Sequence, residues 1–308
     1  MSSDDDVVTK NLSSHSLKPA LDAVATSINS RFEKLLTIPA DPRARLVEAM
    51  RHAAMDGGKR MRPLLTLAAC DLFGVDKEQA LRVGIAIECV HVYSLIHDDL
   101  PCMDNDDQRR GKPTVHIAYD EATAVLAGDA LQALAYEVLA DEATHQDAAI
   151  RADLCLALAR ASGPDGMAGG QMLDLAAEHE TFDLPLTARL QQLKTGALIS
   201  FAVEAGAIMG RASDVESTRL RGYAHDLGLA FQIADDLLDI EGDETLAGKA
   251  LGKDQDAGKS TFVSLMGVER ARAQADLLIN QAIDHLNGFG AEADLLRAIA
   301  RFAIERDR

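Results

Sequence analysis

Hydrophobic residues recur at helical spacing along almost the whole chain. In one typical stretch, Leu131, Leu134, Ala135, Val138 and Leu139 occupy positions i, i+3, i+4, i+7 and i+8, which share one helical face. Glycines and prolines interrupt the pattern, which predicts helices at residues 17–37, 43–55, 60–73, 76–100, 115–140, 146–162, 165–180, 186–210, 213–240, 260–285 and 290–305. No segment alternates apolar and polar residues as a half-buried strand does, so the pattern predicts an all-α protein.

Several of these helices are apolar on every side. The stretch 80–96 carries only Arg82 and Glu88 as charged residues, and the stretch 197–209 carries only Glu204. Helices without a polar face lie at the centre of a bundle or at a subunit interface. We therefore expect a layered helical bundle with a buried middle, and an oligomer.

No repeat and no low-complexity linker divides the chain. Residues 16–308 are therefore expected to form one helical domain, after a disordered tail at residues 1–15. The opening residues are polar and acidic, without the apolar core of a secretory signal. No apolar run reaches about 18 residues, so no membrane span is expected and the cytoplasm is the expected location.

The charge balance narrows the possible partners. The chain has 31 Lys and Arg against 49 Asp and Glu, a formal net charge of -18. Nucleic-acid binding and adsorption to anionic membranes both depend on cationic side chains, so neither is expected. Aromatic residues make up only 4% and Trp is absent, which favours helix over strand.

A dense acidic segment follows the apolar helix predicted at 76–100. It contains five acids within ten residues: Asp98, Asp99, Asp104, Asp106 and Asp107. Like charges at the C-terminal end of a core helix repel one another and oppose the helix dipole, and divalent cations would relieve both effects. A solvated acidic turn is the alternative interpretation.

A second acidic cluster lies near the end of the helix predicted at 213–240. Gln232, Asp235 and Asp239 are spaced by three and four, so they share one helical face. An acidic surface stripe would explain this cluster alone. Two such clusters, each following an apolar helix, favour a shared Mg²⁺ site.

Mg²⁺ held by one or two carboxylates completes its coordination with substrate phosphates, so separate cationic groups should bind those phosphates. Four segments supply them: Lys59–Arg60 with Arg62, Lys194 with Thr195, Arg109–Arg110 with Lys112, and Lys249, Lys253 and Lys259. Each segment alone is more often a solvated surface. Together with the acids they predict a site for two phosphorylated substrates.

Five sequence blocks, in this order, resemble the trans-polyprenyl diphosphate synthases. They are ECVHVYSLIHDDLPCMDNDDQRRGKPTVH (88–116), GGQMLDL (169–175), KTG (194–196), FQIADDLLD (231–239) and GKDQDAGKST (252–261). The resemblance extends over residues 16 to 305, and it points to the bacterial short-chain members, the farnesyl diphosphate synthases or geranyltranstransferases. It implies a homodimeric all-α fold with the cavity inside the bundle.

The resemblance also implies roles for individual residues. Three Mg²⁺ ions per site are expected, two bound by Asp98, Asp99 and Asp104, and a third by Asp235 with Asp239. The allylic diphosphate held by these ions would also contact Arg109, Lys194, Thr195, Gln232, Lys249 and Lys259. Isopentenyl diphosphate would be held by Lys59, Arg62, His91 and Arg110. Without the resemblance, a core histidine is the preferred interpretation of His91.

The implied reaction lengthens a prenyl chain by five carbons. The allylic C–O bond breaks, the isopentenyl double bond attacks the resulting cation, and a proton is lost. Tyr93 lies five residues before Asp98, about 7.5 Å along a helix, so its ring would close the cavity below the diphosphate, with Ser94 beside it. In the family, an aromatic residue here is associated with a fifteen-carbon product.

Three alternatives remain beside a farnesyl diphosphate synthase. PCMDNDD also resembles geranylgeranyl diphosphate synthases, which make a longer product. A terpene cyclase on the same kind of bundle would not need the basic blocks at 59–62 and 109–112. A non-catalytic partner subunit would not need intact acidic clusters.

Overall fold

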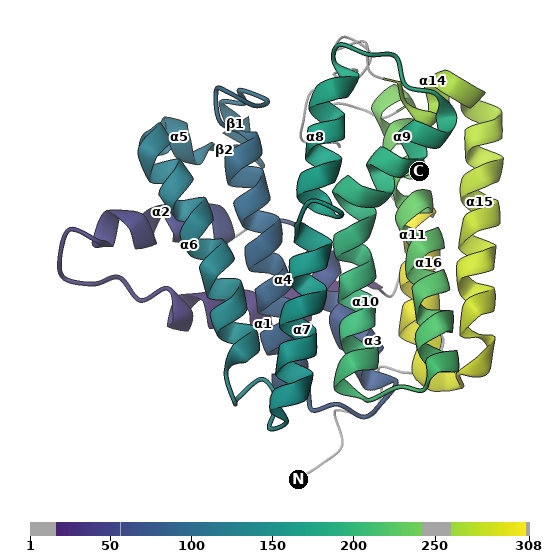
Figure 1. Ribbon diagram of the computed structural model, residues 1–308, viewed down its shortest axis with the longest axis horizontal. Helices are drawn as coiled ribbons and strands as arrows, with labels where there is room; N and C mark the ends of the chain where they lie inside the picture. The colour runs from purple at the N-terminus through teal and green to yellow at the C-terminus, as the bar shows by residue number, and fades with distance from the viewer. Residues whose placement is uncertain (1–16, 56, 242–259, 306–308) are drawn as a thin grey trace.

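Helices make up nearly all of the regular structure in residues 17–55, 57–241 and 260–305, the part of the chain that this computed structural model describes (Figure 1). The α-helices are α1 (Leu17–Leu35), α2 (Ala44–Ala54), α3 (Met61–Asp71), α4 (Lys77–Asp98), α5 (Val115–Ala118), α6 (Glu121–Ala140), α7 (Ala148–Ser162), α8 (Met167–Ala177), α9 (Leu184–Gln191), α10 (Ala197–Met209), α11 (Asp214–Glu241), α14 (Phe262–Met266), α15 (Val268–His285) and α16 (Asp294–Glu305). A π-helix, η2 (Gln192–Gly196), and two 3₁₀ turns, η3 (Leu286–Gly288) and η4 (Ala291–Ala293), complete the helices of these described ranges. The predicted all-α class is confirmed. The predicted tail at 1–15 and Lys249, Lys253 and Lys259 lie outside the described residues.

Three of the predicted helices are divided in the structure. The segment 115–140 breaks because the Asp120 side chain accepts the Thr123 backbone N–H at 2.7 Å and starts α6. The segment 260–285 breaks at Gly267, whose φ of 82° suits glycine. The segment 186–210 becomes α9, η2 and α10, with the π-helix in the middle.

A short β-ribbon joins α4 to α5, although the sequence predicts no strand. Strands β1 (Gln108–Arg109) and β2 (Lys112–Pro113) are antiparallel, with Arg109 opposite Lys112. The two-residue turn between them has φ of 54° at Arg110 and 75° at Gly111, the pair of positive values that a tight hairpin requires. Strands of two residues are too short for any alternation to be detected.

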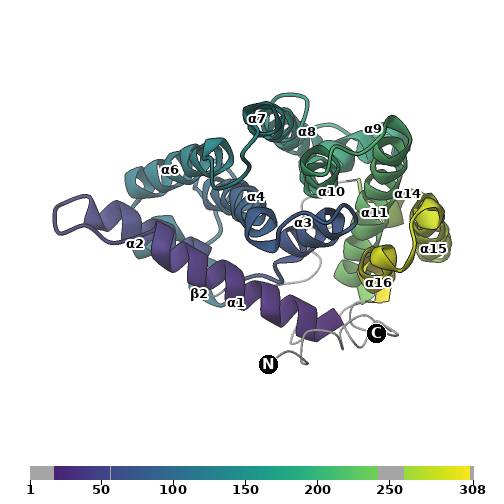
Figure 2. The ribbon, with the colours of Figure 1, turned by 90° about the horizontal axis from the view of Figure 1, so that it is seen from below.

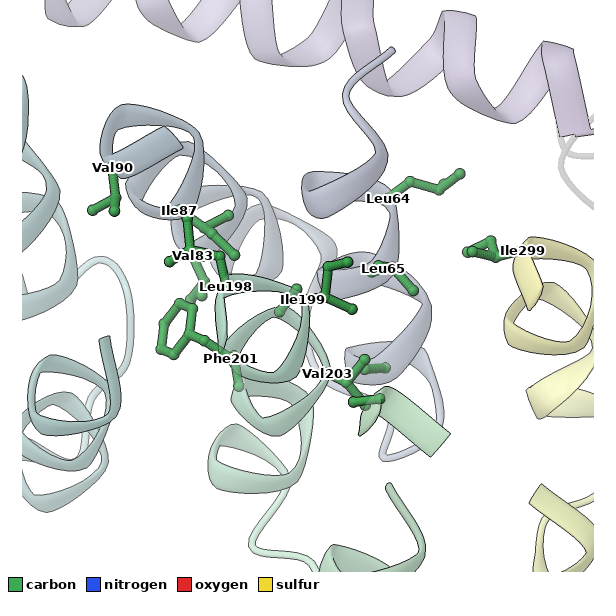
Figure 3. Close-up of a cluster of buried hydrophobic side chains, with 14 of the residues drawn as sticks. Leu64, Leu65, Val83, Ile87, Val90, Leu198, Ile199, Phe201, Val203 and Ile299 are labelled. Atoms are coloured by element: carbon green, nitrogen blue, oxygen red, sulfur yellow. The ribbon is translucent and has the colours of Figure 1, made fainter. Parts of the chain in front are cut away.

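Helix α4 lies in the middle of the bundle, as its apolar sequence predicts. Figure 2 shows α4 and α3 between α1 on one side and α7 and α10 on the other. Val83, Ile87 and Val90 of α4 are fully buried, and Figure 3 shows this side of the helix facing Leu198 and Phe201 of α10. Each such side chain contributes about 1.5–3 kcal/mol through burial. By length and composition alone α4 would also pass for a membrane span, but 67% of its most apolar window is buried inside the protein, as in a core helix.

Candidate active site

A cavity of about 350 Å³ lies where α4, α8 and η2 meet. Seven of the residues predicted for the site line it together: Arg62, His91, Tyr93, Ser94, Asp98, Lys194 and Thr195. Its other walls are largely apolar and include Met103, Met167, Met172, Leu175 and Leu198. The fold therefore joins charged groups from distant parts of the sequence to an apolar space.

The acidic segment folds back over the C-terminal end of α4. The backbone N–H of Asp104 donates to the Asp98 carbonyl oxygen at 2.8 Å, which brings the two aspartates together at one helix end. Burial raises the pKa of Asp98 to about 6, and repulsion from Asp104 adds to this although Lys194 opposes it. A cation at this position would be stabilised by both carboxylates.

Asp99, in contrast, already has a cationic partner. Its side chain is 4% exposed, and its carboxylate accepts from Arg109 Nε at 2.8 and 3.0 Å, while Arg109 Nη2 lies 2.6 Å from Oδ1. This bidentate contact fixes Arg109 in the hairpin against the end of α4. Metal binding by Asp99, predicted from the sequence, would require this carboxylate to exchange Arg109 for the cation.

Arginines surround His91 at the other side of the site. Burial and the charges of Arg62, Arg110 and Arg109 lower the pKa of His91 far below its ordinary value, so its imidazole is neutral near pH 7. Burial also lowers the pKa of Arg62, whose Nε is buried without a hydrogen-bond partner. An anion bound here would accept a hydrogen bond from this unpaired donor and would balance the surrounding positive charges.

The loop before α3 adds to this cluster. The Arg110 guanidinium lies against Gly57 and Gly58, since a Cβ on Gly58 would lie 2.6 Å from Arg110 Nη2. Gly58 also has a φ of 81°, so two independent constraints require glycine there. Lys59 follows in the same loop and is exposed to solvent.

A buried ion pair that the sequence analysis did not identify holds this loop in place. Arg60 donates to Glu88 of α4 at 2.5 Å, to the Ala54 carbonyl at 2.5 Å and to Asn29 of α1 at 3.0 Å. The two charged side chains are 1% and 3% exposed. Glu88 is the one acidic residue in the apolar stretch 80–96, and this isolated charge could have indicated a buried ion pair.

Lys194 projects from the π-helix η2 and is tied to α8. Its Nζ donates to Asp174 Oδ2 at 2.7 Å, and a Cβ on Gly170 would lie 2.1 Å from the Lys194 backbone nitrogen. Gln171 of α8 also lines the cavity, and its buried Nε2 has no hydrogen-bond partner. Gln171 and Asp174 belong to the block GGQMLDL, but no role was predicted for either.

The second acidic cluster lies near the end of α11. Gln232, Asp235 and Asp239 are all partly buried there, and the Asp235 charge stabilises the charged form of Arg62, a residue of the cavity wall. Asp236 differs, since its buried carboxylate accepts the Phe262 backbone N–H at 2.7 Å. Asp236 therefore holds α14 against α11.

The carboxylates suit a hard divalent cation, although they do not form a closed cage. Within the described residues, no three His, Cys, Asp or Glu side chains converge closely enough to hold a metal ion by themselves. Asp98 and Asp104 offer the one or two carboxylates that Mg²⁺ commonly takes from a protein when phosphate oxygens complete its shell. The donor set therefore fits an ion that binds together with a phosphorylated substrate.

Comparison with known proteins agrees with this geometry. The sequence model of the family described as Polyprenyl synthetase matches residues 43–301. Farnesyl diphosphate synthase of Escherichia coli is 45% identical over 85% of this chain and 90% of its own length, and geranylgeranyl diphosphate synthase of Cyanophora paradoxa is 42% identical over 88% and 91%. The solved structure of an FPP/GFPP synthase from Zymomonas mobilis superposes with a TM-score of 0.87, with 59% identity over 94% of this chain and 99% of the other. This chain therefore belongs to the polyprenyl synthetase family.

Proposed function

We propose that the protein condenses dimethylallyl or geranyl diphosphate with isopentenyl diphosphate to give (2E,6E)-farnesyl diphosphate and diphosphate. The main support is the cavity itself, where Asp98 and Lys194, the pair Arg62 and His91, and an apolar body lie together, with the charges of Arg109 and Arg110 acting on His91. A reaction that joins two diphosphates through their hydrocarbon ends requires these three environments together. Membership of the polyprenyl synthetase family supports the same assignment.

Charged side chains would bind the two diphosphates at separate places. Lys194, Thr195, Gln232 and Arg109 would hold the allylic diphosphate, together with Lys249 and Lys259 outside the described residues. Lys59, Arg62 and Arg110 would hold the isopentenyl diphosphate, to which the neutral His91 can donate one N–H. Bound Mg²⁺, held by Asp98, Asp104, Asp235 and Asp239, would stabilise the negative charge that develops on the leaving diphosphate.

The protein would contribute to the reaction through position and through exclusion of water. Lys194 is placed beside the acids by Asp174, so its ammonium can stabilise the leaving group without rearrangement. The methionine and leucine walls exclude water that would otherwise quench an allylic cation. The released diphosphate would accept the proton that the new chain loses.

Product length is the finer part of the proposal. Tyr93 and Ser94 line the cavity from α4, and the Tyr93 ring would close it at fifteen carbons. The related proteins carry farnesyl, geranylgeranyl and FPP/GFPP synthase names, so geranylgeranyl diphosphate is the second candidate product.

Two other activities have less support. A terpene cyclase would have no use for the arginine cluster around His91. A non-catalytic partner subunit would not need Asp98 kept at a position where burial disfavours its charge.

A direct assay tests the function. The purified protein would be incubated with Mg²⁺, geranyl diphosphate and isopentenyl diphosphate, and its products separated by chromatography. We expect mainly a fifteen-carbon diphosphate, and none when EDTA removes the metal. Absence of any chain-extended product would refute the proposal.

We also propose that the protein is a cytoplasmic homodimer. Val125 and Leu126 of α6 and Leu156 of α7 are large apolar residues that are 41%, 57% and 49% exposed. A partner subunit would cover such exposed apolar side chains. Light scattering coupled to size-exclusion chromatography should give twice the chain mass, whereas a monomer would contradict the assembly.

A further inference from the structure

Helix α6 lies behind the α4 side of the cavity without lining it. Tyr93, Ser94, His97 and Asp98 line the cavity from α4, and α4 packs extensively on α6. Among the described residues that line the cavity, none belongs to α6. The most direct route from α6 to the cavity is therefore through side chains of α4.

His97 lies directly on the backbone of α6 at Gly128. A Cβ on Gly128 would lie 2.1 Å from His97 Nε2, 2.6 Å from Cδ2 and 2.7 Å from Cε1, so any larger residue would collide with the ring. His97 Nε2–H donates to the Val125 carbonyl oxygen at 3.1 Å, which holds the ring in this position. Glycine within a helix is less favourable than alanine, so its presence in α6 is best explained by this contact.

The same two helices also hold Tyr93. Its ring meets the His97 ring edge to face, with centroids 5.8 Å apart and planes at 69°. Gln132 Nε2 of α6 donates to the Tyr93 hydroxyl at 3.5 Å, a long contact. One turn forward on α4, from Tyr93 to His97, corresponds to one turn back on α6, from Gln132 to Gly128, as expected for antiparallel neighbours.

We propose that His97, held in place against Gly128, fixes where the Tyr93 ring stands and thereby sets the length of the prenyl product. This inference rests on the proposed function, in which Tyr93 closes the cavity. His97 itself lines the cavity, and the role proposed for it is to position the Tyr93 ring. Gly128 acts indirectly, because its missing side chain leaves the space that the His97 ring occupies.

The two positions should shift the product in opposite directions. His97→Ala removes the edge against which the Tyr93 ring rests, so the floor can recede and longer chains can form. Gly128→Ala displaces the His97 ring from α6 toward Tyr93, so the cavity becomes shorter. A contact between two rings is a modest interaction, and we expect the product ratio to change about threefold or more without a complete switch.

The test compares product distributions from purified full-length proteins given Mg²⁺, geranyl diphosphate and isopentenyl diphosphate. The variants are His97→Ala, Gly128→Ala and the double variant, with Tyr93→Ala as the reference for an open floor. Asp129→Ala, an exposed neighbour of Gly128 on the same helix, is the matched control and should give the wild-type ratio. In the double variant the collision is absent, so its products should resemble those of His97→Ala.

The outcomes separate the proposed role of His97 and Gly128 from the proposed function of the protein. Longer products from Tyr93→Ala, with wild-type ratios from both His97→Ala and Gly128→Ala, would overturn the positioning role of His97 and Gly128 and leave the proposed function intact. A wild type that forms no extended product would refute the function itself. If Gly128→Ala fails to fold, His97→Ala and the double variant still test the proposal. Neither of them contains the collision between a side chain at position 128 and the His97 ring.

Discussion

Tyr93 is the single residue on which the proposed product length depends most directly. Its ring is partly buried in the cavity wall, between His97 and Gln132. Replacement by alanine removes the ring, so we expect Tyr93→Ala to release products longer than fifteen carbons. Chromatography of the products provides the measurement, and an unchanged length would remove Tyr93 as the floor.

Without a bound cation, the ionised carboxylate of Asp98 lowers the free energy of unfolding of the protein. Its pKa is about 6 in the folded state against about 4 when unfolded, so the folded state binds more protons between these values and stability falls as pH rises through them. We therefore expect Asp98→Asn to raise the free energy of unfolding by about 1–3 kcal/mol near pH 8, with little difference at about pH 4.

Urea unfolding at the two pH values, without Mg²⁺, measures this difference. Turnover should fall about a hundredfold or more in the same variant, because a proposed metal ligand is lost. Asp107→Asn, an exposed carboxylate of the same turn, is the control and should change neither quantity appreciably. A variant less stable than wild type near pH 8 would contradict this account of Asp98.

Glu88 should matter far more for stability than another glutamate of the same helix. Removing one partner of a buried ion pair leaves the other charge uncompensated, so Glu88→Gln should lower the free energy of unfolding by about 3–5 kcal/mol. The matched control is Glu78→Gln, whose side chain is 72% exposed in its ion pair with Arg31 and should change stability by less than about 1 kcal/mol. Equal effects in urea unfolding would mean that the Arg60–Glu88 contact has no special role.

Among individual residues, the acids and cations could be found from the sequence because their types and spacing carry the information. The partners of these residues could not. Arg109 lies ten residues from Asp99, and Arg60 lies 28 residues from Glu88, so only the fold decides that they meet. Gln171 and Asp174 were missed because one amide and one carboxylate on a helix suggest no chemistry until a cavity and Lys194 lie beside them.

At the level of the elements, a side-chain hydrogen bond from Asp236 helps to anchor α14 to α11. Asp236→Ala would leave the buried Phe262 N–H without its acceptor, at about 1–3 kcal/mol. We expect faster amide hydrogen exchange at residues 260–266 in this variant. Asp236→Asn keeps an oxygen acceptor and should lose much less protection; equal loss in both variants would show that charge, not this bond, holds α14.

Helices as such were predictable, because a hydrophobic period of 3.6 persists over many residues. Their interruptions were not, since each depends on one local event. Asp120 caps α6, Gly267 reverses the backbone before α15, and η2 gains its wider turn where α8 packs closely at Gly170. The hairpin at 108–113 was equally unpredictable, because its two short strands depend on the turn between them.

Across the whole molecule, the apolar helices are central and their charged ends form the site. Helix α4 is buried along most of its length, and two adjacent acids, Asp98 and Asp99, follow Ile96 and His97 at its C-terminal end. The overall acidity therefore has two parts. The acids of the outer helices are solvated, whereas those of the site are concentrated where a cation would neutralise them.

The β-hairpin connects the two proposed phosphate sites mechanically. Arg109 donates hydrogen bonds to Asp99, beside the proposed site of the allylic diphosphate. The next residue, Arg110, packs against Gly57 and Gly58, in the loop beside the proposed site of isopentenyl diphosphate. With a φ of 54° at Arg110, the short turn gives these neighbours little freedom to move separately. Occupation of one site should therefore alter the affinity of the other, and by thermodynamic reciprocity the effect must be equal in both directions. Calorimetric titration of each substrate, alone and with a non-reactive analogue of the other, would give that coupling free energy.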